Sequence, residues 1–441
     1  MNQSRRTFVK TAVVAGASLP LFNIGRAQTS ANNAIRHASF GASGQARRDI
    51  SNMLSQGVQL VAVADVDASY LAALQERHPD QNFRTYTDWR ELLDKEHKNL
   101  DTVNVSVPDH MHASIGIEAM RHGIHLYGQK PLSQTVHEAR QMTKVAAETG
   151  VVTQMGVQFT SSFYERMTVQ MVQDGVIGKI KKAYVFSHKA WGDSDPLPAR
   201  TDPVPDGFDW DIWCGVADER RYIDKYYHPK QWRRRLDFGT GTLGDMGCHI
   251  YSPMYRALHV GAPISIKSVG GQPNDASWAI DEKVVYTFPG SQYTAGDTIE
   301  VEWTDGDLRP PQEFLDMFGD KMPEQGCIFV GTDGILLQGH QTRPVPYPRE
   351  NFADYRYPRL EPRDHYTDFI NAVKGEDVTP LANFGDFAGP LTEAILLGCI
   401  STHFPNEKLD WNHDKMKFTN SKQASSHIRR KVRKGWEVAG L

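Results

Sequence analysis

Asp237-Phe238-Gly239-Thr240-Gly241-Thr242-Leu243-Gly244-Asp245-Met246-Gly247-Cys248-His249 is the stretch on which the interpretation of this chain depends. Its glycines disfavour the start of a helix, because each loses much backbone entropy when it is fixed. The chain continues through Ile250–Leu258 without a glycine. If the stretch is helical, Asp245 and His249 lie on one face, since they are four residues apart.

Asp245 and His249 have two interpretations. A carboxylate beside an imidazole can orient the ring, fix its tautomer and raise its basicity, which would help the ring to take a proton from a hydroxyl. Alternatively, Thr242 is the N-cap of a helix, Asp245 is the third residue after it, and His249 is a buried histidine with satisfied hydrogen bonds. Spacing alone favours the structural interpretation, because such pairs are common on helices.

Gly-Asp-Met-Gly-Cys-His at 244–249, together with Gln129-Lys130-Pro131 upstream, resembles the glucose–fructose oxidoreductase/inositol dehydrogenase/rhizopine-catabolism (Gfo/Idh/MocA) family. These are two-domain, nicotinamide-dependent oxidoreductases of sugars and polyols, and the resemblance covers nearly the whole chain after its N-terminal segment. The family pairs an Asp-x-x-x-His helix with the lysine of a Glu-Lys-Pro motif, and Gln129 stands where it usually has the glutamate. The resemblance implies that Lys130, Asp245 and His249 form the catalytic set.

Composition sets the broad class of the protein. A chain of 441 residues predicts two or three domains. Its 40% hydrophobic and 23% charged residues are typical of a globular protein, and a net charge of −4 gives no electrostatic case for nucleic acid. The cysteines are far apart and form no Cys-x-x-Cys, so we expect small buried side chains and no zinc site or disulfide framework. They are Cys214, Cys248, Cys327 and Cys399.

The N-terminal segment resembles an export signal. Ser4-Arg5-Arg6-Thr7-Phe8-Val9-Lys10 is a twin-arginine pattern, and a mildly apolar run leads from Thr11–Ile24 to Gly25-Arg26-Ala27. We expect residues 1–27 to direct the folded protein through the Tat translocase to the periplasm. The apolar run is short for a membrane span, and the alternative is a disordered basic tail. Export after folding would suit an enzyme that loads its cofactor first and has no paired cysteines.

The first predicted strand and the turn after it indicate a dinucleotide site. The strand is residues 34–40, and Gly41-Ala42-Ser43-Gly44-Gln45-Ala46 turns into a helix. A Rossmann fold needs Gly-x-Gly-x-x-Gly here, for a tight turn and a close approach to pyrophosphate. The chain keeps the first glycine and has Ser43 and Ala46 in the other two places. We therefore assign Gly41, Ser43, Gly44 and Gln45 to cofactor binding.

A second predicted strand, residues 58–66, has Asp65 at its end. A carboxylate there can accept hydrogen bonds from the adenosine ribose and repel a 2′-phosphate, so NAD is favoured over NADP. The alternative is a loop or cap residue.

Two further strands, residues 100–107 and 123–128, each precede a motif. The first is followed by Pro108-Asp109-His110-Met111-His112. The family has a similar motif near the nicotinamide, so the resemblance implies that Pro108 and His110 contact the cofactor. A His-x-His metal site is the alternative; we expect none, because no further ligand cluster is evident and alternate residues at a helix start diverge. The second strand delivers Lys130 to the edge where open α/β sheets bind ligands; otherwise Lys130 is a solvated turn residue.

We therefore predict an α/β Rossmann domain, residues 33–155, and an α+β domain, residues 156–441, with a large, mostly antiparallel open sheet. Helices are expected around 136–149, 365–374 and 387–401. We expect a homo-oligomer formed through the second-domain sheet. The predicted strands of that sheet are residues 182–188, 264–270, 282–288, 298–303, 327–331 and 334–337.

Three segments of the second domain have open interpretations. Aromatic residues between Trp191 and Trp232 suit a sugar face, a packed core or a subunit interface. Arg233-Arg234-Arg235 could bind a carboxylate or phosphate of the substrate, but a solvated face is favoured, since charge runs usually are solvated. The basic tail, residues 428–434, is interpreted as an exposed helix face.

The predicted reaction is hydride transfer between a sugar or polyol carbon and a tightly bound NAD. His249 would take the hydroxyl proton, Asp245 would orient His249, and Lys130 would hold the oxygen. The competing class is a redox-neutral glycosidase, lyase or epimerase that oxidises its substrate transiently with bound NAD. The family's glycosidase branch has different motifs at the positions of Lys130 and His249, which argues against membership of that branch. A sugar-binding protein without activity is a third class.

Overall fold

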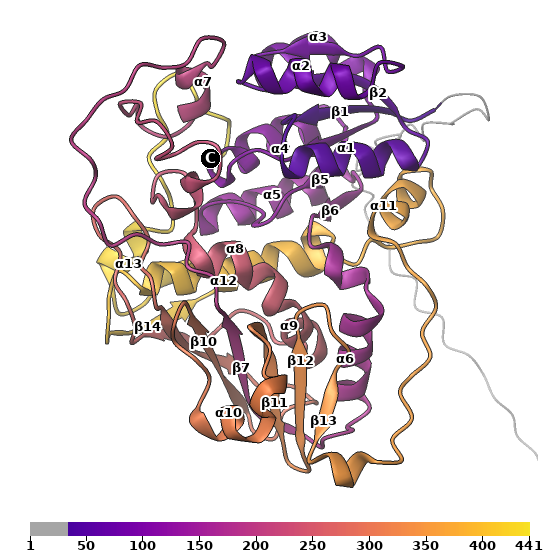
Figure 1. Ribbon diagram of the computed structural model, residues 1–441, viewed down its shortest axis with the longest axis vertical. Coiled ribbons are helices and arrows are strands. Elements are labelled where there is room, and N and C mark those ends of the chain that lie inside the picture. The colour runs from indigo at the N-terminus through magenta and orange to yellow at the C-terminus, as the bar shows by residue number, and fades with distance from the viewer. Residues whose placement is uncertain (1–33) are drawn as a thin grey trace, which may run out of the picture. The chain divides into compact units, whose positions relative to one another are not determined.

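The computed structural model describes residues 34–441, which contain two sheets (Figure 1). The predicted export signal lies outside the described residues. Within residues 34–441 we find no helix with the length and apolar character needed to cross a membrane.

The first sheet has six parallel strands in the order β3-β2-β1-β4-β5-β6. Every residue of β4 is buried, as expected for a strand covered by helices on both faces. The order places β1 and β4 side by side, so the turns that follow them share one edge of the sheet. The strands are β1 (Arg36–Phe40), β2 (Gln59–Ala64), β3 (Arg84–Tyr86), β4 (Thr102–Val105), β5 (His125–Gly128) and β6 (Thr153–Met155).

Five helices connect these strands, and the local sequence explains where α5 begins and ends. α5 begins after a capping box between Thr135 and Glu138 and ends at Gly150, which adopts a left-handed conformation. The predicted helix at 136–149 is therefore confirmed. The helices are α1 (Gln45–Ser55), α2 (Ala68–Arg77), α3 (Trp89–Glu96), α4 (His112–Arg121) and α5 (Val136–Thr149).

The second sheet has nine strands in the order β13-β12-β11-β7-β10-β9-β8-β14-β15. Only β7 and β10 pair in parallel, so the predicted mostly antiparallel sheet is confirmed. The unpredicted strands are short and lie at the two edges, where β13 contains a proline. The strands are β7 (Ile180–Ser187), β8 (Ser265–Ser268), β9 (Lys283–Pro289), β10 (Thr298–Asp305), β11 (Gln325–Gly331), β12 (Ile335–Gly339), β13 (Val345–Tyr347), β14 (Lys408–Asn412) and β15 (Lys417–Phe418).

α12 (Gly389–Ser401) lies between the two sheets (Figure 1). It contacts α5 of the first domain and α8 and β8 of the second. Almost every α12 residue is buried, so the helix is apolar all round and has no polar stripe. It thereby joins both sheets into one core. The other helices are α6 (Phe163–Gln173), α7 (Trp210–Cys214), α8 (Gly241–Ile250), α9 (Ser252–Leu258), α10 (Gln312–Phe318), α11 (His365–Val373) and α13 (Lys422–Ser426).

The basic tail is not a helix, which corrects the sequence-based expectation. α13 ends before it, and Ile428 is buried. The Arg433 backbone N–H donates to Val216 O at 3.0 Å, and its guanidinium donates to the Gly215 carbonyl and the Asp211 carboxylate. The tail bends away from helical geometry because its arginines pair with groups of a neighbouring segment.

The prediction of buried cysteines without disulfides is confirmed. All four thiols are free and buried. Burial raises the pKa of Cys248 to about 12, so this thiol beside the catalytic candidates stays protonated.

Candidate active site

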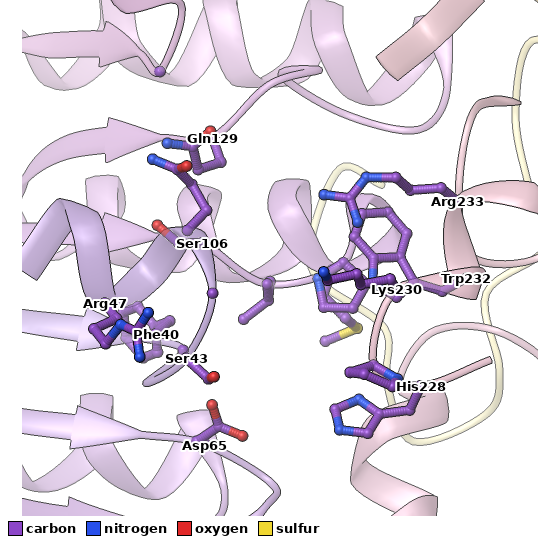
Figure 2. Close-up of a pocket in the computed structure, with 18 of the residues that line it drawn as sticks. Phe40, Ser43, Arg47, Asp65, Ser106, Gln129, His228, Lys230, Trp232 and Arg233 are labelled. Carbon is purple, nitrogen blue, oxygen red and sulfur yellow. The ribbon is translucent and has the colours of Figure 1, made fainter. Parts of the chain in front are cut away.

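A cavity of about 780 Å³ lies at the carboxyl ends of the first-sheet strands. One wall consists of the turn after β1 and the ends of β2, β4 and β5. The other wall comes from the second domain, at residues 189–191, 228–233 and 245–249. Figure 2 shows Ser43, Asp65 and Gln129 on the first wall and Lys230, Trp232 and Arg233 on the second.

The turn after β1 has the geometry of a dinucleotide turn. Gly41 has φ 102°, and a Cβ there would lie 2.6 Å from the Ser106 carbonyl oxygen, so only glycine fits. Gly44 precedes α1 with φ 57°. Gly41, Ser43, Gly44 and Gln45 all line the cavity. Because α1 begins here, its free N–H groups can receive a pyrophosphate.

Asp65 is fixed at the same wall by the backbone. One carboxylate oxygen accepts from Ala42 N at 2.8 Å and the other from Asp67 N at 3.0 Å. Burial raises the pKa of Asp65 to about 6. The carboxylate therefore lies beside the glycine turn, where the ribose of a bound dinucleotide is expected.

Gln129 belongs to a network centred on the buried Asp49. The Asp49 carboxylate accepts from Gln129 Nε2 at 2.9 Å, Ser106 Oγ at 2.7 Å, Gln45 Nε2 at 2.9 Å and Tyr366 Oη at 2.7 Å. A glutamate at position 129 would place a second carboxylate against Asp49. The glutamine is therefore explained by α1, whose Asp49 already supplies a carboxyl group at this position.

Lys130 and Asp245 form the ion pair at the centre of the site. Lys130 Nζ donates to Asp245 Oδ1 at 2.5 Å and to the Asp245 carbonyl at 2.9 Å. Arg233 Nε donates to the same Oδ1 at 3.0 Å. Burial alone would raise the pKa of Asp245, but the charges of Lys130 and Arg233 outweigh it and hold this pKa well below its usual range.

His249 lines the cavity near this pair, but it is not bonded to Asp245 in the described structure. The expectation that Asp245 orients His249 is therefore wrong. The carboxylate turns to Lys130 and Arg233 because two cations attract it more strongly than a neutral ring does. Burial, and then the nearby Lys130 charge, lower the pKa of His249 well below its usual value, so the ring is neutral and can accept a proton.

The structural alternative for this helix is also corrected. The N-cap position is Thr240, so Asp245 lies in the second turn of α8. The hydroxyl of Thr242 accepts from Trp191 N at 2.7 Å and does not cap the helix. Gly241, with φ 66°, begins the helix where the Trp278 side chain packs against its backbone.

The Pro-Asp-His-Met-His motif divides its residues between two roles. Pro108 lines the cavity, but His110 does not: it is fully buried, and its Nε2 lies 3.0 Å from the Trp213 carbonyl. The expectation that His110 contacts the cofactor is therefore wrong, because the ring turns toward the second domain. His112 bridges the Pro131 and Val107 carbonyls, each at 2.7 Å. Residues 34–441 contain no cluster of His, Cys, Asp or Glu suited to a metal.

Asp109 is a buried carboxyl that the sequence reasoning did not assign. It accepts from Thr240 Oγ1 at 2.8 Å. Burial, and then the charge of Asp245, raise the pKa of Asp109 to about 7. Asp109 therefore titrates near neutral pH, whereas Asp245 stays ionised there. Only tertiary contact reveals this, since Asp109 and Asp245 are far apart in the chain.

The aromatic segment, residues 191–232, packs most of its rings into a hydrophobic core cluster. Trp210 stacks on Trp213 with ring centroids 4.7 Å apart, and Phe238 packs on Trp213 at the same distance. Trp191, Trp213 and Trp232 also line the cavity. The core interpretation is therefore confirmed for most of these rings, whereas contact of the cavity-lining rings with a sugar stays a prediction.

The three arginines are not a solvated face, which corrects the favoured interpretation. Arg235 is buried and pairs with Asp193 at 2.8 Å. Arg233 lines the cavity, with its guanidinium 4.2 Å from the Trp232 ring centroid. The sequence feature that could have predicted a buried arginine is Trp232, directly before the three arginines, because an indole face can bind a guanidinium group.

Comparisons with known proteins agree with this geometry. A family model described as "Oxidoreductase family, NAD-binding Rossmann fold" matches residues 35–157, and one described as "Oxidoreductase family, C-terminal alpha/beta domain" matches residues 167–308. The WlbA dehydrogenase from Bordetella pertussis, solved with NADH and UDP-GlcNAcA, has the same fold with a TM-score of 0.60. Its sequence identity is 16%, and the match covers 86% of this chain and 99% of that one.

Two curated relatives are more similar in sequence over shorter regions. Levoglucosan dehydrogenase from Pseudarthrobacter phenanthrenivorans is 25% identical over 43% of this chain and 40% of that protein. A glycosyl hydrolase family 109 protein from Shewanella putrefaciens is 28% identical over 41% of this chain and 44% of that protein. The match thus spans less than half the length of each relative. Two domain models in succession, on a Rossmann sheet joined to an open antiparallel sheet, show that the chain belongs to the Gfo/Idh/MocA family of NAD-binding oxidoreductases.

Proposed function

We propose that this protein transfers a hydride between a carbon of a sugar or polyol and a tightly bound NAD. The observation that carries the proposal is the shared cavity, in which the Lys130–Asp245 ion pair and the neutral His249 face the same space as the glycine turn and Asp65. Bound NAD supplies the hydride acceptor. The residues that would hold it are Gly41, Ser43, Gly44, Gln45, Asp65, Pro108 and Lys130, all of which line the cavity.

Each catalytic candidate has a defined task. His249 is neutral, as a base must be before it accepts a proton, and we assign to it the hydroxyl proton of the substrate. Lys130 donates a hydrogen bond to the same oxygen and stabilises the negative charge that develops on it. Asp245 positions Lys130, since its side chain and its carbonyl both accept from the ammonium. Asp245 is thus a positioning residue for Lys130.

A redox-neutral reaction is the second candidate. The similarity to a glycosyl hydrolase family 109 protein favours it. Oxidation of a hydroxyl would acidify the neighbouring C–H bond, so elimination or epimerisation could follow before the hydride returns. The same residues serve both routes, and the resemblance to the oxidoreductase majority favours net oxidation or reduction.

The aromatic segment supports tight retention of the cofactor. Its backbone joins the turn after β2, where Ala68 N donates to Gly207 O and Asp209 N donates to Val66 O, each at 2.9 Å. Phe208 packs there against His228, which lines the cavity. This segment is bonded to the turn that directly follows Asp65, which favours retention of a dinucleotide bound beside Asp65.

We also propose export and self-association. The twin arginines would carry the folded protein, with its cofactor, through the Tat translocase to the periplasm, where free nicotinamide is scarce. A cofactor that stays bound must return to its starting state in each cycle, through a second substrate or through the same one. Self-association would occur through the second-domain sheet, which leaves Val269 and Ile280 exposed beside β8 and β9.

Cofactor choice should depend on Asp65. Asp65→Ala should weaken NAD binding about tenfold or more, because a charged hydrogen bond contributes roughly 1.5–3 kcal/mol. Asp65→Ala should also reduce the ratio of NAD affinity to NADP affinity. Titration of apoprotein with both nucleotides measures this, with Asp65→Asn as the control that keeps the shape and removes the charge. Equal NAD affinity in the wild type and Asp65→Ala would exclude Asp65 as the ribose residue.

Turnover should depend on Lys130 and His249. Each alanine variant should lower turnover about 10²–10⁴-fold, the range for a lost acid–base group. Asp245→Asn should cost less than loss of His249, because Arg233 and the Asp245 carbonyl remain. His403→Ala, at a half-buried histidine outside the cavity, is the control and should keep its turnover. A folded His249→Ala protein with near-normal turnover would contradict the assignment.

The cofactor should copurify with the protein. Mature protein prepared without nucleotide should release NAD or NADH on denaturation, and a native mass spectrum should show cofactor and subunit count together. Phe208→Ala should lower the retained fraction, because it loosens the aromatic segment; Phe318→Ala, in another core cluster, is the control. If the protein is purified without nucleotide and releases one NADH per product from added NAD, the tightly bound cofactor is refuted and the protein is an ordinary dehydrogenase.

Export should require the twin arginines. Replacing Arg5 and Arg6 by lysine keeps the charge but removes the pattern, so the periplasmic yield should fall while total protein persists. Cell fractionation measures the outcome, and an unchanged periplasmic yield would refute the Tat assignment.

A further inference from the structure

Positive charge dominates the cavity lining. Six cationic side chains line it, against the two carboxylates Asp65 and Asp245. Arg47 and Arg48 belong to α1, at the glycine turn, and the pyrophosphate of a dinucleotide would offset about two charges there. The cations of the second-domain wall then outnumber Asp245, the carboxylate of that wall, which is already paired with Lys130. They are Lys189, Lys230 and Arg233.

Arg233 is held so that part of its guanidinium stays available. Its Nε donates to Asp245 Oδ1, and among residues 34–441 this is the only hydrogen bond that the Arg233 guanidinium makes. The guanidinium carbon lies 4.2 Å from the Trp232 ring centroid and 5.6 Å from that of Trp191. Two indoles and a carboxylate therefore fix the plane, and the terminal Nη donors are left for a ligand. Figure 2 shows Arg233 extending toward the interior of the pocket.

The lysines of the same wall lack protein partners. Within the described part of the chain, the ammonium groups of Lys189 and Lys230 make no ion pair, whereas Lys130 is committed to Asp245. Several like charges around one cavity repel one another unless a ligand compensates them. A planar guanidinium with free terminal donors suits a carboxylate or phosphate in bidentate geometry.

We propose that the substrate is an anionic sugar derivative, a sugar acid or sugar phosphate, whose charged group is bound by Arg233 with help from Lys189 and Lys230. This inference rests on the proposed function, since it names the substrate of the same site. Arg233 contacts Asp245, which contacts Lys130, so the anion would lie next to the oxygen that Lys130 binds. The indole of Trp191 would then face the sugar ring.

The test compares matched pairs of ligands on the NAD-loaded protein: glucuronate with glucose, galacturonate with galactose, and glucose 6-phosphate with glucose. Binding is followed through tryptophan fluorescence, and reduction of the bound NAD is followed separately by absorbance. We expect at least one anion to bind about tenfold or more tightly than its neutral partner, in line with a charge-assisted hydrogen bond. This preference should shrink as ionic strength rises.

Variants locate the anion site. Arg233→Gln should reduce the ratio of anion to neutral kcat/KM about ten- to a hundredfold. Arg233→Lys should give a ratio between those of Arg233→Gln and the wild type, because lysine keeps the positive charge but cannot donate two parallel hydrogen bonds. Lys230→Gln should lower the ratio less, and Lys225→Gln, in the same segment but 85% exposed and outside the cavity, should leave it unchanged. The ratio is the readout, because contact with Asp245 can change turnover of both ligands equally.

Two results would overturn the proposal: neutral ligands that bind as tightly as their anionic partners, or an anion preference that Arg233→Gln leaves intact. A different result would overturn the proposed function instead. In that case anions bind in an Arg233-dependent way, but no ligand changes the redox state of the bound nicotinamide.

Discussion

The ion pair between Lys130 and Asp245 is the interaction on which the site depends. Lys130 follows β5 of the first domain, whereas Asp245 belongs to α8 of the second. Both side chains are largely buried, and breaking a buried pair of this kind typically costs about 3–5 kcal/mol. The pair therefore joins the two domains at the point where a substrate oxygen is expected. It also adds to the effect of burial on its neighbours: burial and then the Lys130 charge lower the pKa of His249, and burial and then the Asp245 charge raise the pKa of Asp109.

Charge is redistributed around this pair relative to the family pattern. The glutamate usual before the lysine is a glutamine here, and Asp49 on α1 provides the carboxylate that the glutamine contacts. Asp49 also accepts from Ser106 and Tyr366, so it connects the loop after β4 with α11. On the opposite side, Arg233 shares Asp245 with Lys130. One carboxylate thus serves two cations, which leaves the second-domain wall with an excess of positive charge.

The fold explains why these groups meet. The order of the first sheet places the turns after β1 and β4 next to each other, and Gly41 allows the two backbones to approach. α12 contacts both domains, so the two sheets cannot pack independently. The aromatic segment then binds the turn after β2 through main-chain hydrogen bonds, and its Trp213 lines the cavity. Each of these contacts involves only a few residues, but together they form one cavity between the domains.

The sequence by itself determined the parallel and antiparallel sheets, the helix of residues 136–149, the buried cysteines and the position of Lys130 at a strand end. These features follow from hydrophobic periodicity, helix capping and the succession of strands and helices along the chain, all of which can be read from the sequence. The sequence could not determine which partner each polar side chain chooses. Asp245 faces Lys130 and Arg233 instead of His249, His110 turns to the Trp213 carbonyl, and Arg235 is buried against Asp193. Those choices were made in the tertiary structure, because the energy of a buried charge depends on neighbours that come from distant parts of the chain.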